Sequence, residues 1–126
     1  MRLGELCKGL MNIPAGCGEL DVSEVVCDSR KAVEGSLFLA VPGETTDGFL
    51  FAREAVSNGA VAVIAPQGGC GETSLGVPVL EVEDLRGVMG DVADRFYGEP
   101  SKELEVVGVT GTKGKTTTVW LLHHLF

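Results

Sequence analysis

Leu37-Phe-Leu-Ala-Val-Pro-Gly43 contains five consecutive apolar residues that end at a Pro-Gly pair. A short apolar run bounded by turn residues is typical of a strand buried on both faces of a sheet. The sequence therefore predicts a strand over 37–41. Short segments rich in β-branched or apolar residues predict further strands over 22–27, 60–65 and 77–82. Together these four segments indicate a domain built around a sheet.

Amphipathic helices are predicted before, between and after these strands. Apolar residues at helical spacing indicate one helix over 3–11 and another over 85–97. Asp47 is the predicted N-cap of a third helix, which lies between them and ends at Asn58-Gly59. Because strands alternate with helices, the sequence predicts an α/β fold with a largely parallel or mixed sheet.

A polar break at Gly98-Glu-Pro100-Ser-Lys102 separates this pattern from the rest of the chain. After the break, the sequence predicts a strand over 104–109, a glycine-rich loop and a last helix from about Lys115. We therefore expect two units. Residues 1–100 form a small mixed-sheet N-terminal domain, and residues 101–126 form the first βα unit of a P-loop ATP-binding domain.

The composition limits the classes of partner. The 126 residues carry a formal net charge of −8, which argues against binding to nucleic acid. The four cysteines have neither C-x-x-C spacing nor histidines at zinc-ligand spacing, so we expect reduced thiols. No apolar run approaches the roughly 20 residues that a membrane span needs. We expect a cytoplasmic protein, a monomer, with no nucleic-acid or membrane partner.

The segment Thr110-Gly-Thr-Lys-Gly-Lys-Thr-Thr117 lies between a predicted strand and a predicted helix. Glycines allow the backbone to wrap around a phosphate group, and the positive end of a helix dipole favours the anion. In such a loop Lys115 would reach the β- and γ-phosphates, and the hydroxyl of Thr116 would bind Mg²⁺. The predicted ATP-binding residues are Gly111, Thr112, Lys113, Gly114, Lys115, Thr116 and Thr117.

The loop departs from the strict pattern G-x-x-x-x-G-K-[ST], because Val109 occupies the position of the first glycine. A glycine-rich turn that binds nothing is the alternative interpretation. The loop by itself is compatible with ATP or GTP and does not identify a reaction. The role of Asp28-Ser29-Arg30, after the first predicted strand, is also undetermined. The triplet could form a ligand site, but such a polar cluster is common in ordinary turns.

Val106-Val-Gly-Val-Thr-Gly-Thr-Lys-Gly-Lys-Thr-Thr-Thr118 resembles the ATP loop of the Mur ligase family. Phe96-Tyr97 and Pro100-Ser101 favour the branch that adds the third peptide residue (MurE) over the branch that adds the terminal dipeptide (MurF). The upstream segments that resemble the N-terminal domain of both branches are Asp28-Ser-Arg30, Gly35-Ser-Leu-Phe-Leu-Ala-Val-Pro-Gly43, Asp47-Gly48 and Asn58-Gly-Ala-Val-Ala-Val-Ile64.

The resemblance implies a ligase of peptidoglycan biosynthesis, and hence a role in cell-wall biogenesis, cell shape and cell division. Such an enzyme uses ATP and Mg²⁺ to phosphorylate the D-Glu carboxylate of UDP-N-acetylmuramoyl-L-Ala-D-Glu. The amine of a diamino acid, meso-diaminopimelate or L-lysine, then attacks the acyl phosphate. By position, the resemblance implies a UDP-sugar site at Cys27 (through its backbone), Ser29, Glu44, Thr45 and Thr46.

Three positions depart from the family pattern. Lys113 replaces the usual asparagine of the loop, Phe49 stands where many relatives have histidine, and Glu44 places an acid near an anionic diphosphate.

In the family the catalytic residues follow the segment seen here. We therefore expect a fragment of a ligase, with no catalytic residue of its own and no ligase activity alone. The alternatives are a non-catalytic nucleotide-binding module, a MurF-type ligase, and a generic P-loop kinase or NTPase.

Overall fold

The computed structural model describes residues 1–44, 48–69 and 74–126. Its centre is a four-stranded sheet in the order β1-β2-β3-β4, and each neighbouring pair of strands is parallel. The strands are β1 (Glu24–Val26), β2 (Ser36–Leu39), β3 (Ala62–Pro66) and β4 (Val79–Val82). The predicted α/β fold is confirmed. Where a largely parallel or mixed sheet was predicted, the four strands are all parallel.

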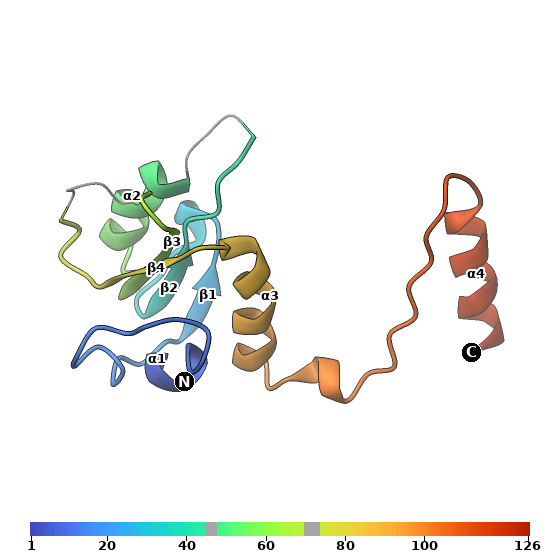
Figure 1. Cartoon of the computed structure of the whole chain (residues 1–126), viewed down its shortest axis with the longest axis horizontal. Helices are drawn as coiled ribbons and strands as arrows, with labels where there is room; N and C mark the ends of the chain where they lie inside the picture. The colour runs from blue at the N-terminus through green and yellow to red at the C-terminus, as the bar shows by residue number, and fades with distance from the viewer. Residues whose placement is uncertain (45–47, 70–73) are drawn as a thin grey trace.

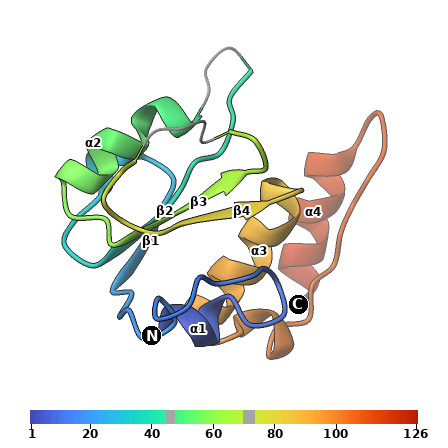
Figure 2. The same cartoon turned by 60° about the vertical axis from the view of Figure 1, so that its left-hand side comes forward.

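Helices lie on both sides of this sheet, with α1 and α3 on one side and α2 on the other (Figures 1 and 2). The helical segments are α1 (Leu3–Leu6), η1 (Ser29–Lys31), η2 (Gly48–Phe51), α2 (Ala52–Ser57), α3 (Leu85–Phe96), η3 (Pro100–Lys102) and α4 (Lys115–Leu125). The predicted helices over 85–97 and before Asn58-Gly59 are confirmed. The predicted cap Asp47 lies outside the described residues.

The first helix is much shorter than the predicted segment 3–11. It ends at Leu6, and Gly9 adopts a φ of +73°, which interrupts a right-handed helix. The guanidinium of Arg95 in α3 donates hydrogen bonds to the carbonyl oxygens of Leu6 (3.1 Å) and Lys8 (2.7 Å). A residue of another helix thus satisfies backbone groups that a longer α1 would have satisfied internally.

The sheet buries side chains on both faces, which explains the unbroken apolar run in β2. Leu37 and Leu39 belong to the core cluster that contains α1 and α3. Phe38 and Ala40 belong to the cluster on the opposite face, which contains α2. Alternation along a strand sends successive side chains to opposite faces, so a strand between two helical layers is apolar on both faces, as β2 is from Leu37 onward.

The predicted strand over 104–109 is wrong. Residues 105–110 have no regular secondary structure, and the side chain of Val106 is 80% exposed. A strand forms only when another strand accepts and donates its backbone hydrogen bonds. The segment runs away from the sheet instead, toward α4, which lies apart from it (Figure 1). Within residues 1–44, 48–69 and 74–126, no helix is long and apolar enough to span a bilayer.

We predict that the sheet unit is stable without residues 106–126. Endoproteinase Glu-C should cut readily at Glu103 and Glu105, which are exposed and lie at the start of the irregular segment. The remaining core should keep the thermal midpoint of the intact chain, because no residue of α4 is buried. Loss of the cooperative unfolding transition after this cut, measured by circular dichroism, would contradict the prediction.

Candidate nucleotide-binding site

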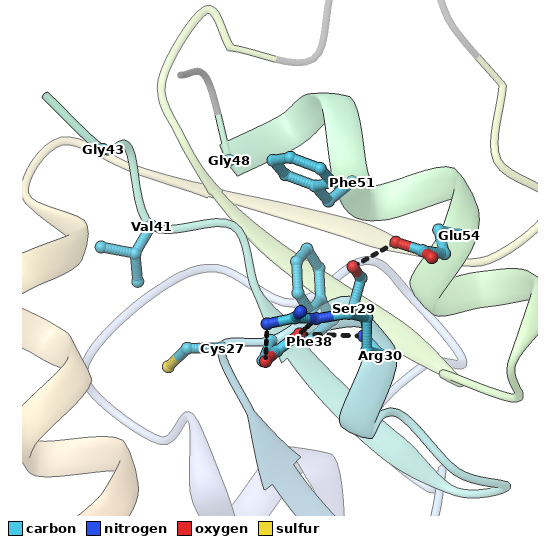
Figure 3. Close-up of a pocket in the computed structure, with 10 residues that line it drawn as sticks. Cys27, Ser29, Arg30, Phe38, Val41, Gly43, Gly48, Phe51 and Glu54 are labelled. Carbon is cyan, nitrogen blue, oxygen red and sulfur yellow. Dashed lines mark hydrogen bonds and ion pairs between the residues drawn. The ribbon is translucent and has the colours of Figure 1, made fainter. Parts of the chain in front are cut away.

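A cavity of about 530 Å³ lies at the carboxyl ends of β1 and β2 (Figure 3). Cys27 to Arg30 follow β1 directly, and Val41 and Gly43 follow β2. In open parallel sheets, ligands bind in crevices at this end of the strands. The lining residues are Cys27, Asp28, Ser29, Arg30, Phe38, Val41, Gly43, Gly48, Phe51 and Glu54.

Asp28 and Arg30 form a local pair at the rim of the cavity. The Asp28 carboxylate accepts a hydrogen bond from the Arg30 backbone N–H (3.0 Å) and so caps η1. It also accepts two hydrogen bonds from the guanidinium, at 3.0 Å and 2.9 Å. The bonds to Arg30 hold the pKa of Asp28 below its usual value. Arg30 is therefore a structural partner of Asp28, a question that the sequence left open.

Ser29 lies in the wall of the cavity, and only 5% of its surface is exposed. Its hydroxyl donates a hydrogen bond to the carboxylate of Glu54 in α2. Its carbonyl oxygen accepts a hydrogen bond from the side-chain amide of Asn58 (3.0 Å). These two bonds fasten η1 to α2, and they fix the orientation of the serine toward the cavity.

Two phenylalanines give the cavity an apolar, aromatic part. Phe38 comes from β2 and is buried, whereas Phe51 comes from η2 and is 45% exposed. Figure 3 draws both rings among the residues that line the cavity. Sequence reasoning assigned these residues to the core of a strand and to the apolar side of a helix. Only the exposure of Phe51, which the sequence does not reveal, distinguishes it from a core residue.

Gly48 allows η2 to pack directly on the end of β2. A Cβ atom at this position would lie 2.6 Å from the carbonyl carbon of Ala40 and still closer to the carbonyl oxygen of Val41. Such distances do not occur between real atoms, so only glycine fits. This close approach brings η2, and with it Phe51, to the cavity.

Cys27 lies at the edge of the cavity next to α3, where its sulfur is 3.9 Å from the sulfur of Met89. Burial raises the pKa of the Cys27 thiol, so the group stays neutral near pH 7 and is a poor nucleophile. Of the predicted UDP-sugar residues, the structure thus brings Cys27 and Ser29 together. Glu44 is exposed and does not line the cavity, and Thr45 and Thr46 lie outside the described residues.

The predicted phosphate loop precedes a helix, as expected. Gly111 and Gly114 have φ angles of +150° and +79°, and Gly114 is the N-cap of α4. Glycine has no side chain that could cap the helix, so the N-cap residue makes no side-chain hydrogen bond to the first turn of α4. Lys115 and Thr116 are exposed at this end of the helix. The arrangement can receive an anion at exposed backbone N–H groups.

The family model described as "Mur ligase family, catalytic domain" matches residues 21–97. The match covers the whole sheet and every residue that lines the cavity. The chain belongs to the Mur ligase family.

Curated relatives of this Mur ligase chain include two bacterial enzymes named UDP-N-acetylmuramoyl-L-alanyl-D-glutamate–2,6-diaminopimelate ligase. The one from Halalkalibacterium halodurans is 46% identical over 86% of this chain and 21% of its own length. The one from Caldanaerobacter subterraneus subsp. tengcongensis is 43% identical over 97% of this chain and 25% of its own length. The chain thus spans between a fifth and a quarter of the length of these relatives, and its predicted resemblance to MurE-type ligases is confirmed.

Among solved structures, the MurF ligase of Thermotoga maritima, in complex with ADP, is similar to this chain. The two superpose with a TM-score of 0.56 and share 36% identity, over 75% of this chain and 21% of the MurF chain. The fold is thus that of a Mur ligase, as the resemblance implied.

The packing of η2 on β2 can be tested by making the same change, glycine to alanine, at two separate positions. Gly48→Ala should lower the free energy of unfolding by about 1–3 kcal/mol, because the added methyl group meets backbone atoms. Gly90→Ala in α3 is the matched control: its methyl group would meet nothing within 4 Å. It should raise the same free energy by about 0.5–1 kcal/mol. Urea denaturation measures both values, and effects of equal sign would contradict the assigned packing.

Proposed function

We propose that this chain supplies the nucleotide-sugar-binding part of a MurE-type ligase of peptidoglycan synthesis. The reaction joins a diamino acid to UDP-N-acetylmuramoyl-L-Ala-D-Glu, with ATP and Mg²⁺. The names of the curated relatives support this reaction, and they favour diaminopimelate over L-lysine as the amino acid. For the 126 residues by themselves we propose binding without ligase activity. Our domain assignment is 1–100 for the UDP-sugar unit and 101–126 for the start of the ATP-binding unit.

The cavity at the carboxyl ends of β1 and β2 is the observation that carries the first half of this proposal. Its volume of about 530 Å³ falls within the roughly 300–1,000 Å³ of small-molecule sites. It combines an exposed aromatic ring, Phe51, with hydrogen-bonding groups at Ser29 and Glu54. A nucleobase needs this combination, because it stacks through its face and hydrogen-bonds through its edge.

Charge indicates which end of the ligand enters the cavity. The charged lining groups are two carboxylates, Asp28 and Glu54, and one guanidinium, Arg30. Two negative charges and one positive charge give the lining a net charge of one negative. The positive charge is, in addition, bound by Asp28. A diphosphate group would be repelled there. We therefore assign the uncharged uracil and ribose to the cavity and place the diphosphate outside it, with Cys27 and Ser29 as contacts of the base. Glu44, Thr45 and Thr46 stay proposed contacts from the family resemblance alone.

Titration of the chain with UDP tests this assignment. Amide NMR shifts should appear at 27–30 and 48–54, around the cavity. Phe51→Ala should weaken the binding about tenfold, since stacking of a base on an aromatic ring contributes about 1–3 kcal/mol. Leu50→Ala is the matched control, because Leu50 is 71% exposed in the same helical turn and does not line the cavity. Shifts confined to 111–117, or equal effects of the two substitutions, would contradict a uridine site here.

The second half of the proposal assigns ATP and Mg²⁺ to the loop from Gly111 to Thr117. The ADP bound to the similar Thermotoga maritima MurF supports it. Lys115 and Thr116 begin α4 beside the backbone N–H groups of its first turn. A lysine ammonium there would contact the terminal phosphates, and the Thr116 hydroxyl would provide one oxygen ligand to Mg²⁺. Lys113 adds a second cation to the loop.

Lys115→Ala should weaken the binding of Mg-ATP to this chain about tenfold, because it removes a charge-assisted hydrogen bond worth about 1.5–3 kcal/mol. The measurement is an Mg-ATP titration followed by the amide shifts of 111–117. Lys8→Ala is a charge-matched control, since Lys8 is exposed near the N-terminus and far along the chain from the loop. If both variants bound Mg-ATP as the unsubstituted chain does, the role of Lys115 would be refuted.

We further propose that the protein acts as a cytoplasmic monomer. Free thiols at Cys7, Cys17 and Cys27 fit a reducing compartment, and ATP and UDP-linked substrates are available there.

A further inference from the structure

The Ser29 hydroxyl has a fixed direction of hydrogen bonding. A hydroxyl carries a single hydrogen, and an ionised carboxylate can only accept. The hydrogen bond between Ser29 and Glu54 therefore uses the one hydrogen of the serine. What Ser29 can still present to the cavity is a lone pair. Toward a ligand, this serine is an acceptor.

The surrounding bonds keep the serine in this state. Ser29 follows Asp28, whose carboxylate caps η1, and its carbonyl oxygen is held by Asn58. Its side chain is almost completely buried, so water competes little for the hydroxyl. Glu54 itself lines the cavity, and its carboxylate is a second group that only accepts. This part of the wall is thus uniformly an acceptor surface.

We propose that Glu54 is a positioning residue that makes the cavity select a pyrimidine with a ring N–H group. This inference rests on the proposed uridine site. Uracil presents such a donor at N3, between its two carbonyl groups, and this donor would meet the Ser29 oxygen. Cytosine presents an unprotonated N3, which would face another acceptor, so both atoms would lose their hydrogen bonds to water without compensation. Its only donor on that edge is the exocyclic amino group, and using it requires a different placement of the base.

Removal of Glu54 would release this constraint. Without the carboxylate, the Ser29 hydroxyl can rotate and donate to an unprotonated ring nitrogen as readily as it accepts from an N–H group. Glu54→Ala should therefore change the preference between the two bases more than it changes the stability of the fold. Glu54 is exposed and lies in a helix, where alanine is well tolerated.

The experiment compares the dissociation constants of UDP and CDP, measured by NMR titration of the whole chain. The unsubstituted chain should prefer UDP by about tenfold, and Glu54→Ala should reduce this preference to about twofold. Glu105→Ala is the charge-matched control, because Glu105 is exposed in the irregular segment after η3. It should leave both the preference and the thermal midpoint unchanged, whereas Glu54→Ala should also lower the midpoint, because it removes the hydrogen bond of the buried Ser29 hydroxyl.

A double-mutant cycle distinguishes positioning through Ser29 from a general effect of the lost charge. In the S29A background, Glu54→Ala should not change the UDP-to-CDP ratio further, because the group that it orients is absent. An equal change in both backgrounds would overturn the inference, as would a UDP preference that survives Glu54→Ala. Failure of the unsubstituted chain to bind UDP would overturn the proposed function as well, so the two failures are distinguishable.

Discussion

The burial of β2 between two helical layers is the constraint on which the rest of the structure depends. Leu37 and Leu39 pack toward α1 and α3, while Phe38 and Ala40 pack toward α2. Strands buried on both faces are typical of parallel sheets, and β2 pairs in parallel with β1 on one side and β3 on the other. The parallel order then places the carboxyl ends of β1 and β2 side by side. The cavity is a consequence of that placement.

The turns that follow β1 and β2 supply the polar and aromatic side chains that line the cavity. After β1 the chain turns at once into η1, because the Asp28 carboxylate caps that turn. The chain that follows β2 returns in η2, which approaches the strand so closely that only Gly48 fits. The first turn supplies Ser29, and the second supplies Phe51. A polar group and an aromatic ring thus line the same cavity although 22 positions separate them in the sequence.

The sequence predicts which segments are buried better than it predicts which residues contact one another. Segments rich in apolar and β-branched residues located the four strands to within a few residues, and the signal is clearest in β2 and β3, which are buried on both faces. The same signal failed over 104–109, where none of the strands in the described part of the chain pairs with this segment. For the cavity, the polar residues after β1 were found by their motif. Glu54 was missed because its contact with Ser29 joins positions 25 apart, and no local pattern records such a pair.

The electrostatics of the chain explain why the direction of hydrogen bonds should govern recognition. With a net charge of −8, the field of the whole protein opposes an anionic ligand. The positive charge of the guanidinium at the cavity is balanced by the Asp28 carboxylate that it binds, so it adds little net attraction for a phosphate. Affinity at this cavity must then come from stacking and from uncharged hydrogen-bonding groups. Because Ser29 and Glu54 both present lone pairs, the ligand group that compensates them is a neutral N–H donor, which a nucleobase can provide and a phosphate cannot.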